Sequence, residues 1–208
     1  MRISRMLVAG VAAATALTVS VAGCGGHKTL SPTSTTKSRS ATSATSSSPG
    51  PASSAPAETT DYTGLLIQAT DINAPEQFTA GPPIKNPNGQ PGVATTFSTQ
   101  DGGHVINDTI QVLTDPAAAT NALNAAKEAQ RNAIKNPQPG SANMGTGATT
   151  LSGNKPDGSK GVLILLFTDG KAFVTLEFDG PVDSLPPEDF VNDVGGKQDA
   201  AVKKGLGG

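Results

Sequence analysis

The side chains that could take part in chemistry are few in this 208-residue chain, which contains two histidines and one cysteine. His27 lies in a polar stretch near the cysteine, and His104 follows the turn-forming residues Asp101-Gly102-Gly103. A Ser-His-Asp system would have to use His104, yet no serine lies in the Gly-x-Ser-x-Gly context that presents such a nucleophile. We therefore interpret His104 as a solvated turn residue and expect no hydrolase triad.

Metal and cofactor sites are not indicated either. The closest group of acids, Glu188, Asp189 and Asp193, lies at the start of a predicted helix, where carboxylates favour the positive end of the helix dipole. The stretches "DINAPE" and "NKPDGSKG" lack the spaced oxygen ligands and closing glutamate of a calcium loop. "GTGATTLSG" lacks a P-loop lysine. We interpret these stretches as loops and predict no metal, no cofactor and no enzymatic activity.

The single cysteine, Cys24, follows an amino-terminal pattern typical of exported proteins. Arg2 and Arg5 precede the uncharged run "MLVAGVAAATALTVSVAG", in the order of a secretory signal peptide. This run holds about 18 residues rich in Ala, Gly, Thr and Ser, whereas a membrane-spanning helix needs about 20 mainly apolar ones. A cleaved signal over residues 1–23 is the better interpretation.

The residues around the predicted cleavage point, Val21-Ala22-Gly23-Cys24, resemble the lipobox of bacterial lipoproteins. The resemblance implies that Cys24 carries a diacylglycerol, becomes the new amino terminus, and holds the protein on the extracytoplasmic face of the cell membrane. Two acyl chains on one residue anchor a protein stably. The alternative is a free cysteine behind an ordinary signal peptide or an uncleaved anchor. A lipidated Cys24 would leave no thiol for a disulfide or a metal site.

Composition divides the rest of the chain in two. Residues 24–60 consist largely of Ser, Thr, Ala, Pro and Gly, so they bury too little apolar surface to fold, and we predict a disordered tether. Residues 61–208 are long enough for one domain. This part has 10 Lys and Arg against 16 Asp and Glu, a formal charge of −6, which argues against a nucleic-acid partner.

The predicted domain alternates helical and extended segments. Apolar spacing and turn residues predict a short first helix, a Pro- and Gly-rich loop, two strands, a long helix, two further strands and a final helix. In the long helix, Asp115 is the expected N-cap and Pro116 the first helical residue. The final helix has Phe190, Val191 and Val194 as apolar anchors, with an interruption expected at Gly195-Gly196. In chain order the predicted elements are "DYTGLLIQATDI", "GPPIKNPNGQPG", residues 93–99, residues 104–113, residues 115–136 ended by "NPQPG", "KGVLILLF", "AFVTLEF" and "PPEDFVNDV".

The clearest local signal is the apolar segment "KGVLILLFTDGKAFVTLEF". Asp169-Gly170 is a favoured pair for a two-residue hairpin turn. Such a turn would place Phe167 opposite Ala172 and Leu166 opposite Phe173. Because one face of this hairpin is wholly apolar and the other half apolar, we expect it to be central and covered on both faces.

The element order predicts an α+β fold, an antiparallel β-sheet backed by helices in a single domain. The stretches "LLIQATDINAPEQFT", "TDPAAATNALNAAK", "VLILLF" and "AFVTLEF" resemble small mycobacterial and actinobacterial surface lipoproteins and the exported sensor-like domains of the same bacteria. The resemblance implies a non-catalytic cell-envelope module.

Three functions remain open at this point. In the first, the half-apolar hairpin face formed by Val162, Ile164, Leu166 and Phe173 lines a pocket for a lipid or another apolar envelope ligand, unless helices cover it as ordinary core. In the second, the domain is an accessory protein that binds another envelope protein through its acidic surface or loops. An enzyme is the third and least favoured reading.

Overall fold

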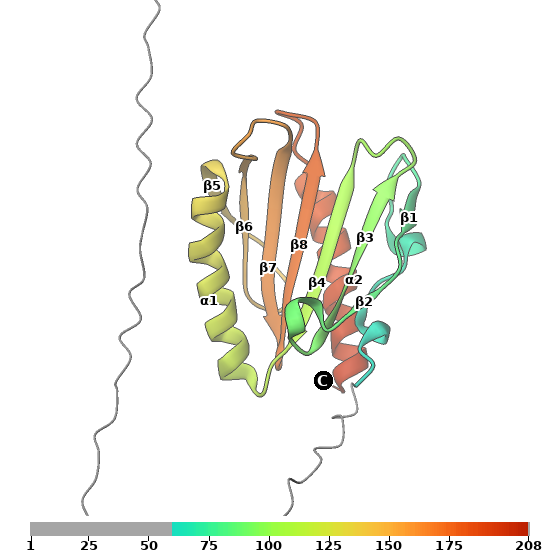
Figure 1. Cartoon of the computed structure of the whole chain (residues 1–208), viewed down its shortest axis with the longest axis vertical. Helices are drawn as coiled ribbons and strands as arrows, with labels where there is room; N and C mark the ends of the chain where they lie inside the picture. The colour runs from blue at the N-terminus through green and yellow to red at the C-terminus, as the bar shows by residue number, and fades with distance from the viewer. Residues whose placement is uncertain (1–59, 208) are drawn as a thin grey trace, which may run out of the picture. The chain divides into compact units, whose positions relative to one another are not determined.

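The computed structural model describes residues 60–207, which form one domain built on an antiparallel sheet (Figure 1). Cys24, the lipobox, the predicted signal peptide and almost all of the predicted tether lie outside the described residues. Three short 3₁₀ turns (η1–η3), eight strands and two long helices make up the domain. In chain order they are η1 (Thr63–Leu65), η2 (Ala69–Asp71), β1 (Phe78–Ala80), β2 (Ile84–Lys85), η3 (Pro87–Gly89), β3 (Gly92–Thr99), β4 (Val105–Val112), α1 (Pro116–Ala133), β5 (Lys135–Ser141), β6 (Thr146–Asn154), β7 (Gly161–Asp169), β8 (Ala172–Gly180) and α2 (Glu188–Leu206).

The sheet confirms the predicted α+β class. Its strands run in the order β1-β3-β4-β8-β7-β6-β5, with β2 also paired to β3, and every pairing is antiparallel. The hairpin β7–β8 lies in the middle of this order, as its apolar sequence predicts.

The two helices cover opposite faces of the sheet (Figure 1). One face carries Phe97, Ile106, Val174 and Leu176 into a large core that also contains Val194 of α2. The other face packs against α1 over strands β6, β7 and β8. Since successive side chains of a strand point to opposite faces, β7 contributes to both cores and is apolar along nearly its whole length.

The β7–β8 turn differs from the prediction by one residue. The two turn residues are Gly170 and Lys171, so Phe167 lies opposite Val174 rather than Ala172, and Leu166 lies opposite Thr175 rather than Phe173. Only Gly170 has a positive φ, at 52°, which fits a type II′ turn with glycine first. A shift of two positions in the pairing preserves the strand's alternation, and each side chain therefore lies on its predicted face.

The carboxyl end of the long helix is followed by two strands that the sequence did not reveal. Asp115 caps α1 by accepting a 2.8 Å hydrogen bond from the Ala118 N–H, as predicted. The segments "NPQPG" and "GTGATTLSG", expected as loops, lie instead in β5 and β6. Proline is tolerated in β5 because this strand forms the edge of the sheet.

Both terminal helical predictions need correction. The segment "DYTGLLIQATDI" forms two separate 3₁₀ turns, η1 and η2, rather than one helix. At the other end, α2 continues through Gly195-Gly196 without the expected interruption. The reason at Gly195 is packing: a Cβ there would lie 2.6 Å from Leu165 Cδ2 and closer still to Met144 Sδ, so glycine permits close contact between α2 and the sheet.

We expect Gly195→Val to lower the free energy of unfolding by about 1–3 kcal/mol, because the added atoms overpack this contact. Gly196→Val is the matched control, since no atom lies within 4 Å of a Cβ at that exposed position. Urea denaturation of both variants measures the difference. Equal stability of the two variants would contradict the packing explanation.

Candidate ligand-binding site

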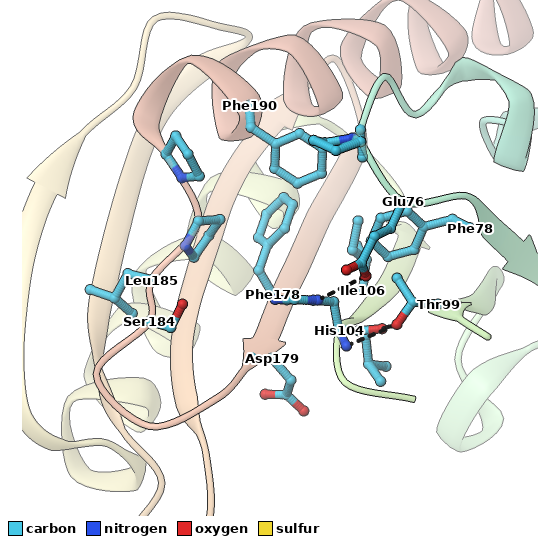
Figure 2. Close-up of a pocket in the computed structure, with 16 residues that line it drawn as sticks. Glu76, Phe78, Thr99, His104, Ile106, Phe178, Asp179, Ser184, Leu185 and Phe190 are labelled. Carbon is cyan, nitrogen blue, oxygen red and sulfur yellow. Dashed lines mark hydrogen bonds and ion pairs between the residues drawn. The ribbon is translucent and has the colours of Figure 1, made fainter. Parts of the chain in front are cut away.

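An apolar pocket lies where the amino end of α2 meets the ends of β1, β4 and β8 (Figure 2). Its volume is about 240 Å³, slightly below the roughly 300–1,000 Å³ of sites for drug-sized ligands. Three chain segments, residues 74–78, 99–106 and 178–190, supply all of its lining. The lining residues are Ala74, Pro75, Glu76, Phe78, Thr99, His104, Val105, Ile106, Phe178, Asp179, Gly180, Ser184, Leu185, Pro186, Pro187 and Phe190.

Three phenylalanines form the main wall of the pocket (Figure 2). The rings of Phe78 and Phe190 are stacked with centroids 6.5 Å apart, and Phe178 meets Phe190 edge to face at 6.0 Å. Aromatic pairs at such distances contribute roughly 0.5–1.5 kcal/mol beyond their buried area. The wall is therefore held in place by its own ring contacts.

The β3–β4 turn positions the one histidine of the pocket. Asp101 Oδ1 accepts hydrogen bonds from the Gly103 N–H (2.9 Å) and the Thr99 hydroxyl (2.7 Å). These bonds, the first above all, lower the pKa of Asp101. Thr99 Oγ1 in turn accepts a 3.1 Å bond from the backbone N–H of His104. The turn thus fixes the start of β4, from which the His104 side chain extends into the pocket.

His104 and Glu76 form the polar end of the pocket. His104 Nδ1 lies 3.5 Å from Glu76 Oε2, and the two side chains are 46% and 58% exposed. The imidazole also packs against the end of β8, where a Cβ on Gly180 would lie 3.4 Å from His104 Cδ2. Ser184 lines the same pocket, but among the described residues no hydrogen bond joins its hydroxyl to His104.

The sheet face that the sequence nominated for a ligand lies elsewhere. Val162, Ile164, Leu166 and Phe173 are at most 5% exposed and pack with Leu123, Ile134 and Leu151 between the sheet and α1. None of the four lines the aromatic pocket or the second pocket described next. Their assignment to a ligand stays a prediction.

The second pocket, of about 320 Å³, lies among the start of α1, the β7–β8 turn and the end of α2. Its lining includes Asp115, Asp169, Lys171 and Lys203. Lys203 is already paired with Asp199, and burial, then the neighbouring Asp199, raise the pKa of Asp169. We favour the smaller aromatic pocket as the ligand site because its lining is mainly apolar with a single polar pair, which is the composition typical of small-molecule sites.

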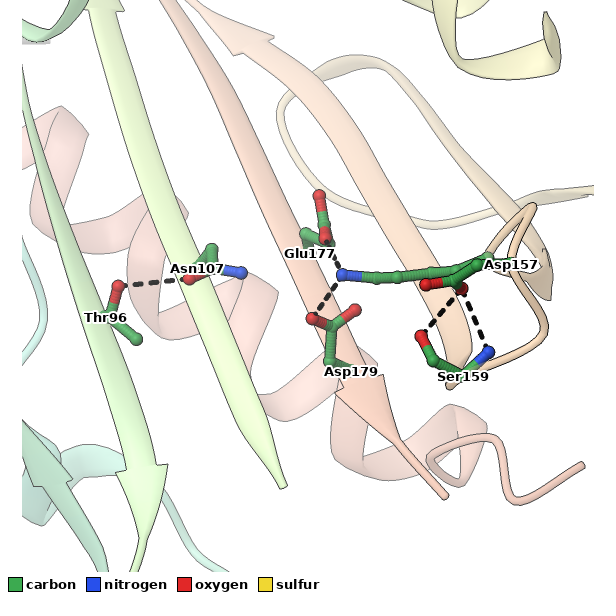
Figure 3. Close-up of polar contacts among 7 residues, drawn as sticks. Thr96, Asn107, Asp157, Ser159, Glu177 and Asp179 are labelled. Carbon is green, nitrogen blue, oxygen red and sulfur yellow. Dashed lines mark hydrogen bonds and ion pairs between the residues drawn. The ribbon is translucent and has the colours of Figure 1, made fainter. Parts of the chain in front are cut away.

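Polar side chains on β3, β4 and β8 occupy the face of the sheet beside α1 (Figure 3). Lys155 donates to Asp179 at 2.6 Å and lies 3.2 Å from Glu177. Burial opposes its charge, yet these two carboxylates raise the pKa of Lys155. Thr96 donates a 3.0 Å hydrogen bond to Asn107. Lys155 thus binds one Asp179 oxygen, while the other, Oδ1, has no hydrogen-bond partner among the described residues. We interpret this face as a surface stabilised by the Lys155 ion pairs.

Across residues 60–207, no three His, Cys, Asp or Glu side chains come together in a group that could hold a metal ion. No helix formed by the same residues has the length and apolar character needed to span a bilayer.

Sequence reasoning missed most of the pocket because its residues come from three distant segments. His104 is half exposed beside its turn, as the sequence predicts, and it also lines the pocket. Phe190, which the sequence predicts as an apolar anchor of the final helix, lines it as well. One signal was present: the chain has six phenylalanines, and Phe78, Phe178 and Phe190 are three of them.

The described residues therefore define an α+β domain, an antiparallel sheet between two helices with an aromatic pocket at one end. Neither a protein-family model nor a curated protein sequence matches the chain. Among solved structures, it is similar to the crystal structure of the extracellular domain of PknH from Mycobacterium tuberculosis. The TM-score is 0.52 with 10% sequence identity, over 71% of this chain and 95% of that one. At this identity the similarity shows the fold.

Proposed function

We propose that this protein is a non-catalytic cell-envelope lipoprotein whose folded domain binds a small apolar ligand in the aromatic pocket. The observation that carries the proposal is an open cavity of about 240 Å³ with three phenylalanines on its wall and one polar pair at its end. Pockets of this composition, apolar with few polar groups, are typical of small-molecule sites. The volume favours a single acyl chain or a ring system over a two-chain lipid.

The envelope location rests on separate support. The lipobox-like sequence ending in Cys24 implies export and lipid anchoring, and the fold is similar to that of an extracellular domain. A sensor or carrier of an apolar envelope compound fits both features. Binding to another envelope protein, without any small ligand, is the alternative.

Phe190→Ala is expected to weaken binding of an apolar ligand at least tenfold, because it removes the ring that contacts both other phenylalanines. Native mass spectrometry with organic extraction, on the protein exported by an actinobacterial host, measures co-purifying ligand. Leu151→Val, which alters the core under α1 away from both pockets, is the control and should retain the ligand. A wild-type protein free of ligand that also binds no added alkyl or aryl compound would overturn the proposal.

Cys24→Ala tests the anchor independently of the pocket. We expect the variant to leave the detergent phase on Triton X-114 partitioning and to lose the mass of the diacylglycerol. A Ser47→Ala variant, altered in the predicted tether, should partition like the wild type. If Cys24→Ala stays in the detergent phase with its mass otherwise unchanged, the lipoprotein assignment is wrong.

A further inference from the structure

The charges around the aromatic pocket are almost all of one sign. The three segments that line it, residues 74–78, 99–106 and 178–190, contain no lysine or arginine. His104 is their single basic side chain, and it already faces Glu76. Their six carboxylates belong to Glu76, Asp101, Asp179, Asp183, Glu188 and Asp189.

One of these carboxylates is neutralised from outside the pocket. Lys155 binds Asp179 on the other face of the sheet, and the Asp179 side chain points away from the pocket in Figure 2. Glu76, by contrast, lines the pocket and has no lysine or arginine partner among the described residues. The potential at the polar end of the pocket therefore favours a positive charge.

The aromatic wall of the pocket also favours a positively charged ligand. Aromatic faces carry negative charge density and attract ammonium groups within about 6 Å of the ring centre. Phe78, Phe178 and Phe190 supply three such rings beside the Glu76 carboxylate.

We propose that the pocket takes an apolar amine, a single alkyl or aryl group that carries one ammonium, with the ammonium at the Glu76 carboxylate and the apolar body against the phenylalanines. This inference rests on the proposed function, because it assigns the head group of the ligand for the same pocket. A carboxylate or phosphate head would meet Glu76 and the surrounding acids, and is disfavoured for that reason.

Three ligands with one chain length test the head group: octylamine, octanol and octanoate. Their affinities for the full-length protein, with Cys24→Ala to remove a competing lipid anchor, are measured by isothermal titration calorimetry. We expect octylamine to bind most tightly and octanoate least. Glu76→Gln should weaken octylamine about fivefold, the upper range for an exposed ion pair, and leave octanol within twofold.

Glu128→Gln is the matched control, since it removes the same charge from the exposed face of α1 and should change none of the three affinities. Octanoate binding as tightly as octylamine, or an unchanged octylamine affinity in Glu76→Gln, would overturn the amine assignment while leaving a pocket for apolar ligands. If none of the three ligands binds the protein whose pocket is unaltered, the proposed function is overturned as well.

Discussion

The wild-type protein is expected to lose about 2–4 kcal/mol of unfolding free energy between pH 5 and pH 9 because of Asp108. Asp108→Asn should remove this loss. Asp108 lies on β4 between Ile106 and Ile110, is 0% exposed, and faces the core shared with α2. Neither of its carboxylate oxygens has a hydrogen-bond partner among the described residues. Burial raises the pKa of Asp108 from 3.8 to about 8.

The direction of this change in stability with pH follows from proton linkage. Between pH 4 and pH 8 the folded protein keeps the Asp108 proton, whereas the unfolded chain releases it. Stability from this group is therefore complete below pH 4 and is lost as the pH rises through 8. One pKa unit corresponds to about 1.36 kcal/mol. About one unit of the shift lies below pH 5, so the roughly three units between pH 5 and pH 8 give the upper end of the expected range.

Urea denaturation at pH 5 and pH 9 measures this difference in the wild type and the variant. Asp157→Asn is the control, because the N–H and hydroxyl of Ser159 lower the pKa of Asp157, and its carboxylate stays ionised across the whole range. That variant should show the same pH dependence as the wild type. An equally steep loss of stability in Asp108→Asn would show that Asp108 is not responsible.

Gln198→Ala is expected to lower the free energy of unfolding by about 2–6 kcal/mol. Gln198 of α2 is 0% exposed, and its carboxamide accepts a 3.1 Å hydrogen bond from the Ile67 N–H and donates a 2.7 Å bond to the Leu65 carbonyl. Each buried backbone group left without a partner costs about 1–3 kcal/mol. Truncation leaves two such groups.

The loss of stability in Gln198→Ala should be greatest in the segment that contains η1 and η2. Hydrogen exchange at the Ile67 amide is expected to accelerate far more than exchange at Val174 in the sheet centre. Gln130→Ala on α1 is the control, a half-buried helical glutamine for which no side-chain bond is described, and it should alter stability by less than about 0.5 kcal/mol. Unchanged exchange at Ile67 in Gln198→Ala would contradict this role.

The sequence by itself determined the elements whose signals are local. Asp115 and Pro116 specify the start of α1 through a cap and a fixed φ, both of which act within one turn. Period-two alternation placed Ile106, Asp108 and Ile110 on one face of β4, and apolar residues on both sides of β7 indicated a central strand. These predictions succeed because each depends on neighbours a few residues away.

Tertiary structure alone decided the features that depend on distant partners. The segment around η1 and η2 is not one helix because Gln198, more than 130 residues later, bonds its backbone. Strand β5 forms despite its prolines because it is an edge, which only the finished sheet defines. The pocket unites Glu76, His104 and Phe190 from three segments, and their contacts arise only when α2 packs onto the sheet.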